Sequence, residues 1–70
     1  MKRSIAMENR LEAFEKMLAT VQAEYAAVTE RMTQLKEAGR EKSATYRQLM
    51  GNKMQLQEQL NRYRTFGLLD

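Results

Sequence analysis

The sequence predicts an all-α fold, an antiparallel two-helix coiled-coil hairpin. Apolar residues recur in alternating steps of three and four along most of the chain, which is the spacing of one helix face. The chain has no proline and three glycines, and it is rich in Ala, Leu, Met, Glu, Gln, Lys and Arg, so its composition favours helix nearly throughout. The apolar repeat fails at one place, near Gly39, where the chain can reverse.

The first helix is expected over about residues 5–38. In the seven-residue repeat abcdefg, assigning Leu11 to position a puts an apolar residue at every a and d position from residue 7 to residue 35. We call the apolar a and d residues of both helices the seam, the surface predicted to pack between helices and between copies of the chain. Its first half consists of Met7, Leu11, Phe14, Leu18, Val21, Tyr25, Val28, Met32 and Leu35.

A turn is expected over about residues 39–42. The next a and d positions are Gly39 and Lys42, which interrupt the seam because one has no side chain and the other carries a charge. Gly39 can adopt the left-handed conformation that ends a helix. Ser43 can accept hydrogen bonds from the first free amides of a new helix.

The second helix is expected over about residues 43–66, followed by a short tail at 67–70 that begins with a helix-ending glycine. Position a at residue 53 holds a lysine, which we interpret as a register-setting residue whose stem lies along the apolar surface. The second half of the seam consists of Tyr46, Leu49, Leu56, Leu60 and Tyr63.

The seven-residue phase is the same before and after the turn, so one long continuous coiled-coil helix is the alternative fold. Reversal midway between residues 40 and 41 would place Phe14 opposite Gly67, Leu18 opposite Tyr63, and Val28 opposite Lys53. Every a position then faces a d position, as an antiparallel pair requires. In the middle of the first helix leucine occupies a and valine occupies d, the reverse of the preference of parallel dimers, and this favours the hairpin.

A chain of 70 residues without cysteine buries little surface and has no disulfide to stabilise it. A hairpin also covers each apolar stripe from one side only. We therefore expect a homodimer in which two hairpins form a four-helix bundle. The first helix is longer than the second, so Met7 and Leu11 would project beyond it unless Leu68 and Leu69 fold over them.

No residue pattern predicts catalysis, and we expect no enzyme activity, cofactor or metal. The chain lacks histidine and cysteine, the usual ligands of zinc and other transition metals. Glu8, Glu12 and Glu15 share part of one helix face, but we interpret them as a solvated surface. A buried lysine at position 53 could act as a nucleophile, yet a thin bundle offers no pocket for a substrate.

Two methionines and a glycine on the second helix lie outside the seam and are candidate contacts with a further partner, such as another helical protein: Met50, Gly51 and Met54. The function expected is therefore a non-enzymatic, self-associating interaction or scaffold module. Ordinary packing and a tolerated glycine are the simpler interpretations of the same three residues.

The net charge of +3 arises entirely in residues 36–70, which motivates the alternative of weak nucleic-acid association. Lys42, Lys53 and Arg64 recur every eleven residues, but no nucleic-acid-binding motif accompanies them. No apolar stretch approaches the ~20 residues needed to span a bilayer, and no secretory signal is evident. We expect a cytoplasmic protein that binds no membrane.

Overall fold

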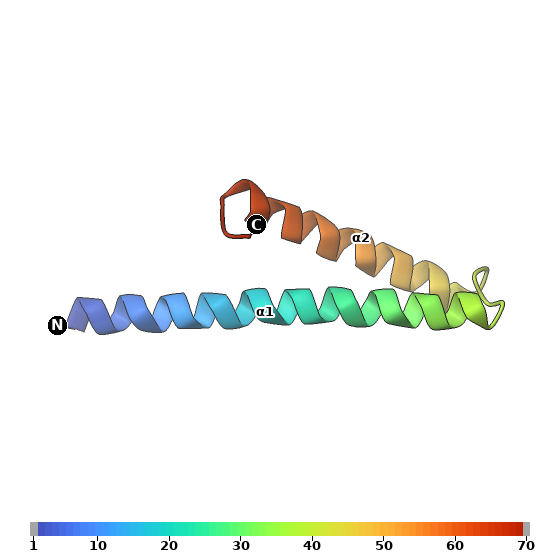
Figure 1. The fold of residues 1–70 in the computed structure, drawn as a ribbon, viewed down its shortest axis with the longest axis horizontal. Coiled ribbons are helices and arrows are strands. Elements are labelled where there is room, and N and C mark those ends of the chain that lie inside the picture. The colour runs from blue at the N-terminus through green and yellow to red at the C-terminus, as the bar shows by residue number, and fades with distance from the viewer. Residues whose placement is uncertain (1, 70) are drawn as a thin grey trace.

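The computed structural model describes the backbone of residues 2–69 and the side chains of residues 8–69. Helix α1 spans Lys2–Glu37 and helix α2 spans Ala44–Thr65, and the chain reverses direction between them (Figure 1). The two helices pack against each other, which confirms the predicted all-α hairpin. The alternative fold, one continuous helix, does not form, because the chain makes two separate helices.

Helix α1 ends because Gly39 adopts a left-handed backbone conformation, with φ of 74°. The Arg40 N–H donates to the Leu35 carbonyl at 2.8 Å and the Gly39 N–H donates to the Lys36 carbonyl at 3.0 Å. These two bonds form a Schellman ending, which satisfies carbonyls that the last helical turn would otherwise leave without donors. Glycine suits this position because it lacks the Cβ atom that makes positive φ costly.

Helix α2 begins at a serine cap. The Ser43 side-chain oxygen accepts a hydrogen bond from the Tyr46 N–H at 3.1 Å, which satisfies one of the free amides of the first turn. The same hydroxyl donates to the Arg40 carbonyl at 2.8 Å. One serine thus joins the end of the turn to the start of the second helix.

The end of α2 repeats the ending of α1. Gly67 has φ of 75°, the Leu68 N–H donates to the Tyr63 carbonyl at 2.9 Å, and the Gly67 N–H donates to the Arg64 carbonyl at 3.0 Å. Both helices therefore end within two residues of the boundaries expected from glycine placement. The start of α1 lies three residues earlier than expected.

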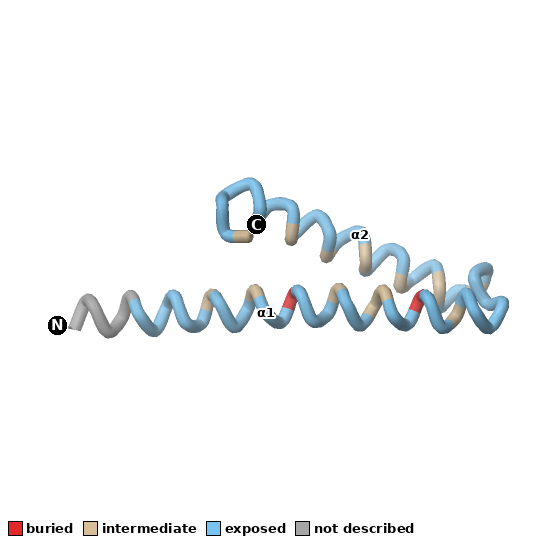
Figure 2. The backbone as a smooth tube through the Cα atoms, viewed as in Figure 1, coloured by how far each residue is buried: buried red, intermediate tan, exposed pale blue. Residues whose placement is uncertain are grey.

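The hairpin is thin, with extents of 57 × 19 × 18 Å. Among residues 8–69, the buried hydrophobic side chains are Val21 at 6% exposure and Met32 at 8%, both on α1. Figure 2 shows half-buried residues on the sides of the two helices that face each other, and most other residues between 8 and 69 are exposed. Close packing is thus restricted to one line of contact.

The helices diverge from the turn toward the free end of α2 (Figure 1). Near that end the rings of Phe14 and Tyr63 meet edge to face, with centroids 5.8 Å apart and an interplanar angle of 78°. The predicted pairing placed Phe14 opposite Gly67 and Tyr63 opposite Leu18, so this contact differs from it by one helical turn. The predicted pairing assumes that the two helix axes stay at a constant distance. Where the helices diverge, long side chains can reach across the wider gap and contact a residue one turn away from the predicted neighbour.

Candidate interaction surface

The seam lies mainly between the helices. From Phe14 to Tyr63 its members are half-buried, apart from the buried Val21 and Met32. Leu11 differs, because 60% of it is exposed although it occupies an a position. The side chain of Met7, the first predicted seam residue, lies outside the described side chains. The seam is therefore partly covered along the hairpin and uncovered at Leu11.

Lys53 is half-buried within the seam. Its Nζ lies 6.0 Å from the centroid of the Tyr25 ring on α1, at the outer limit of a cation–π interaction. The predicted neighbour of Lys53 was Val28, one helical turn away along α1. The lysine thus directs its ammonium group toward an aromatic residue of α1. Its role as a register-setting residue stays a prediction.

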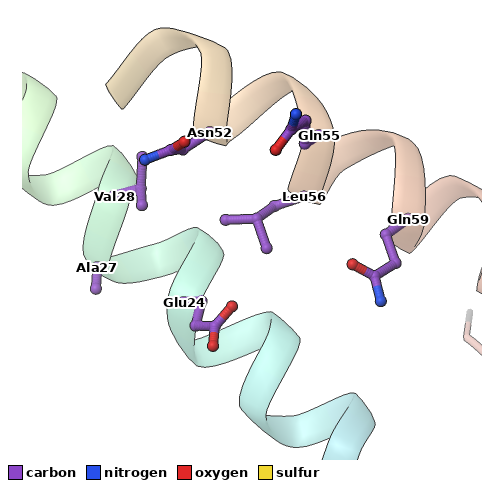
Figure 3. Close-up of a pocket in the computed structure, with 7 residues that line it drawn as sticks. All are labelled: Glu24, Ala27, Val28, Asn52, Gln55, Leu56 and Gln59. Atoms are coloured by element: carbon purple, nitrogen blue, oxygen red, sulfur yellow. The ribbon is translucent and has the colours of Figure 1, made fainter. Parts of the chain in front are cut away.

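A groove of about 400 Å³ runs along one flank of the hairpin, and Figure 3 shows its side chains. Its apolar part comes from Ala27, Val28 and Leu56, and Leu56 points from α2 toward α1. The lining residues are Glu24, Ala27, Val28, Asn52, Gln55, Leu56 and Gln59. With three amides and one carboxylate, this groove offers hydrogen bonds and no acid–base pair or nucleophile.

The sequence interpretation missed the amide side of this groove. Asn52, Gln55 and Gln59 are separated by steps of three and four, so they share one flank of α2. That spacing is a signal in the sequence, but amide residues at such positions are also typical of an ordinary solvated flank. Only the position of α1 beside them makes a groove.

The three candidate partner contacts lie on α2. Met50 and Met54 are both exposed, Met54 to 65%. At Gly51, an added Cβ would find no atom within 4 Å, so within one hairpin nothing approaches this glycine closely. Gly51 and Met54 also line a shallow hollow together with polar residues of the same helix. No second element of the hairpin takes part in it.

A second exposed apolar region lies at the open end of the hairpin. Phe66, the last residue before the helix-ending glycine, is 78% exposed, and Leu68 is 48% exposed. Leu69 is half-buried. The C-terminal tail therefore leaves Leu11 mostly exposed. The sequence interpretation did not single out Phe66, which occupies a flanking g position.

Charged residues do not gather into a site in the part of the chain that the structure describes. No group of three or more acidic side chains in residues 8–69 is arranged to hold a metal ion, and this includes Glu8, Glu12 and Glu15. Lys42 lies in the turn before α2 and Arg64 lies in the last turn of α2, so roughly 30 Å of helix separates them. Lys53 between them is directed into the seam, so the three cations form no continuous basic surface.

Neither described helix combines the length and apolarity needed to cross a membrane. Comparison with protein-family models, curated proteins and solved structures finds no match to this chain.

Proposed function

We propose that this protein is a non-enzymatic helical interaction module that acts by self-association in the cytoplasm. Two hairpins would pack seam to seam as a coiled-coil four-helix bundle, which other proteins could use as a scaffold. The partner of first choice is a second copy of the chain.

One observation carries this proposal, the incomplete burial of a regular apolar seam. Fully burying a large aliphatic or aromatic side chain contributes roughly 1.5–3 kcal/mol, and most seam residues here obtain only part of that. A hairpin of this size also orders a long stretch of backbone at a large cost in conformational entropy. A second hairpin would bury the exposed part of the seam without requiring any change within the first.

Sedimentation and thermal unfolding test this proposal. We expect the mass to approach twice the chain mass of 8.2 kDa at micromolar concentration. The melting temperature should rise with protein concentration, because association stabilises the folded state by mass action. A folded 8.2 kDa monomer with a concentration-independent melting temperature would contradict the proposal.

The surface that associates can be identified with a matched pair of variants. Leu49 is half-buried in the seam of α2, whereas Gln48 beside it is exposed. Leu49→Ala should weaken both association and folding, because it removes apolar area from the seam. Gln48→Ala should change neither by more than about 0.5 kcal/mol, as expected of an exposed position away from special features.

A further inference from the structure

The N-terminal part of α1 projects beyond α2 in the hairpin (Figure 1). Helix α2 ends at Thr65, and its Tyr63 contacts Phe14, so residues 2–13 of α1 have no helix of the same chain alongside. We call residues 2–13 the projecting segment. It extends roughly 18 Å at the rise of an α-helix, and it contains the exposed seam residue Leu11.

The charges that flank Leu11 have no opposite charge within reach on α1. Arg10 occupies position g, and Glu8 and Glu15 occupy position e. Residues three or four positions apart are neighbours on a helix, and at those distances Arg10 has no acidic residue while Glu8 and Glu15 have no basic one. Positions e and g are those at which coiled-coil partners exchange ion pairs.

We propose that the projecting segments of two copies pair with each other in parallel. This inference rests on the proposed self-association and adds the orientation of the two copies. In a parallel pair each g residue faces the e residue five positions later on the other chain, so Arg10 faces Glu15 of the second copy. The two-fold symmetry of the dimer forms this pair twice. Leu11 then packs against Leu11 of the second copy.

The opposite orientation places like charges together. In an antiparallel pair, g positions face g positions of the other chain and e positions face e positions. With Leu11 opposite position 7 of the second copy, Arg10 would lie beside Arg10, and Glu8 beside Glu8. Like-charge neighbours oppose association, so the charge pattern selects the parallel orientation.

Charge complementarity is confined to the N-terminal part of α1, from the projecting segment to Glu15 just beyond it. The next g–e pair of a parallel alignment joins Met17 to Gln22 and is uncharged. Further along, Arg31 would face Lys36, a like-charge pair. A parallel α1 pair is thus favoured at the projecting segment and disfavoured near the turn, where the seam of α1 already faces α2. The same chain supplies both members of the Arg10–Glu15 pair. A second copy of the chain therefore complements the charges of the projecting segment, and we assign it as the partner of this surface.

Cysteine cross-linking tests the orientation directly, because the chain contains no natural cysteine. In a parallel pair, position 11 faces itself at a distance that a disulfide can span. Leu11→Cys should therefore form a disulfide-linked dimer in most of the protein under mild oxidation. The matched control is Asn9→Cys, at the outward f position of the same segment, which should remain largely unlinked.

Charge reversal provides a second test that adds no cysteine. Arg10→Glu and Glu15→Lys should each raise the dimer dissociation constant about tenfold, because each replaces two attractive pairs by two repulsive ones. The double variant should return to within about twofold of the natural protein, because it only exchanges the positions of the two charges. The matched control is Glu30→Lys, which makes the same change of charge at an exposed f position with no charged residue three or four positions away. It should leave the dissociation constant within about twofold.

The outcomes separate the two proposals. A natural protein that stays monomeric overturns the proposed self-association and, with it, the parallel pairing. A dimer in which the Leu11→Cys variant stays unlinked and the double charge variant does not recover overturns the parallel pairing alone. In that case the two hairpins associate in the antiparallel orientation or through another face. Helicity of each variant by circular dichroism establishes that it is folded.

Discussion

Lys53 is the residue at which the seam departs most from an apolar repeat. Lys53 is half-buried and its ammonium group lies 6.0 Å from the centre of the Tyr25 ring. A cation–π contact at a partly exposed site contributes about 0.5–1 kcal/mol. Burying an additional leucine at the same place would contribute more, because the surrounding seam is apolar. We therefore expect the lysine to cost stability.

Replacing Lys53 by leucine should raise the melting temperature. We expect a gain of about 1 kcal/mol, which corresponds to about 4–8 °C for a domain of this size. Lys53→Arg is the control, since it retains a cation near Tyr25 and should shift the melting temperature by less than about 2 °C. Thermal unfolding followed by circular dichroism measures both. A lower melting temperature for the leucine variant would show that the charge stabilises the fold.

The two helices owe their ends to two glycines in the left-handed conformation and one serine cap. Gly39 and Gly67 each end a helix with the same pair of hydrogen bonds. The third glycine, Gly51, lies inside α2, where glycine is less favourable than alanine by up to about 1 kcal/mol. The surroundings of all three are open, because an added Cβ would meet no atom within 4 Å. Backbone conformation alone therefore decides the effect of alanine at each position.

Replacing the glycines by alanine should change the free energy of unfolding in opposite directions at the helix ends and inside α2. Gly39→Ala and Gly67→Ala should each lower the free energy of unfolding by about 1–2 kcal/mol, because they force a side chain into positive φ. Gly51→Ala should raise it by up to about 1 kcal/mol, because alanine is the better helix former. Urea unfolding of the three variants at one protein concentration measures these differences.

The same alanine at Gly51 also tests whether a partner approaches this glycine. If Gly51→Ala stabilises the chain and leaves the dimer dissociation constant unchanged, Gly51 is a tolerated glycine. If it weakens association, a second backbone must lie close to position 51 in the assembly, and Gly51 is a contact residue.

At the scale of the whole molecule, the hairpin is a thin rod whose positive charge is spread along α2 and the turn. Counterion release makes polyanion binding depend on how many phosphates a protein can neutralise together. Lys42 and Arg64 are too far apart to act on adjacent phosphates, and Lys53 is directed toward Tyr25. These positions argue against the nucleic-acid alternative.

The protein should elute from a heparin column below physiological ionic strength, about 0.15 M. The reason is that Lys42, Lys53 and Arg64 form no continuous basic surface with which to neutralise neighbouring phosphates together. Elution well above that salt concentration would favour nucleic-acid association. In that event Lys42→Gln combined with Arg64→Gln should lower the eluting salt, which identifies the cations responsible.

The apolar repeat and the turn glycine could be predicted from the sequence alone. Val21 and Met32, the buried hydrophobic residues of the described side chains, are both a or d positions of the seven-residue repeat. Gly39, where that repeat fails, lies in the turn with positive φ. These features depend on residues close together in the chain, whose conformational preferences act locally.

Contacts between the two helices, and the exposure that depends on them, could not be predicted from the sequence. The contact of Phe14 with Tyr63 depends on the angle between the two helices, which local periodicity does not determine. The amide-lined groove exists only because α1 lies beside Asn52, Gln55 and Gln59. The exposure of Phe66 depends on where the tail leaves α2. The exposure of Leu11 depends on where α2 ends.

The sequence by itself determined that the chain is helical, where its apolar face lies and where the first helix can end. Those properties follow from propensity, periodicity and one glycine, all of which act over a few residues. Only the tertiary structure decided between a hairpin and a continuous helix, because the apolar phase is the same on both sides of Gly39. It also decided which part of the seam stays exposed, since that depends on two helices of unequal length diverging from a common turn.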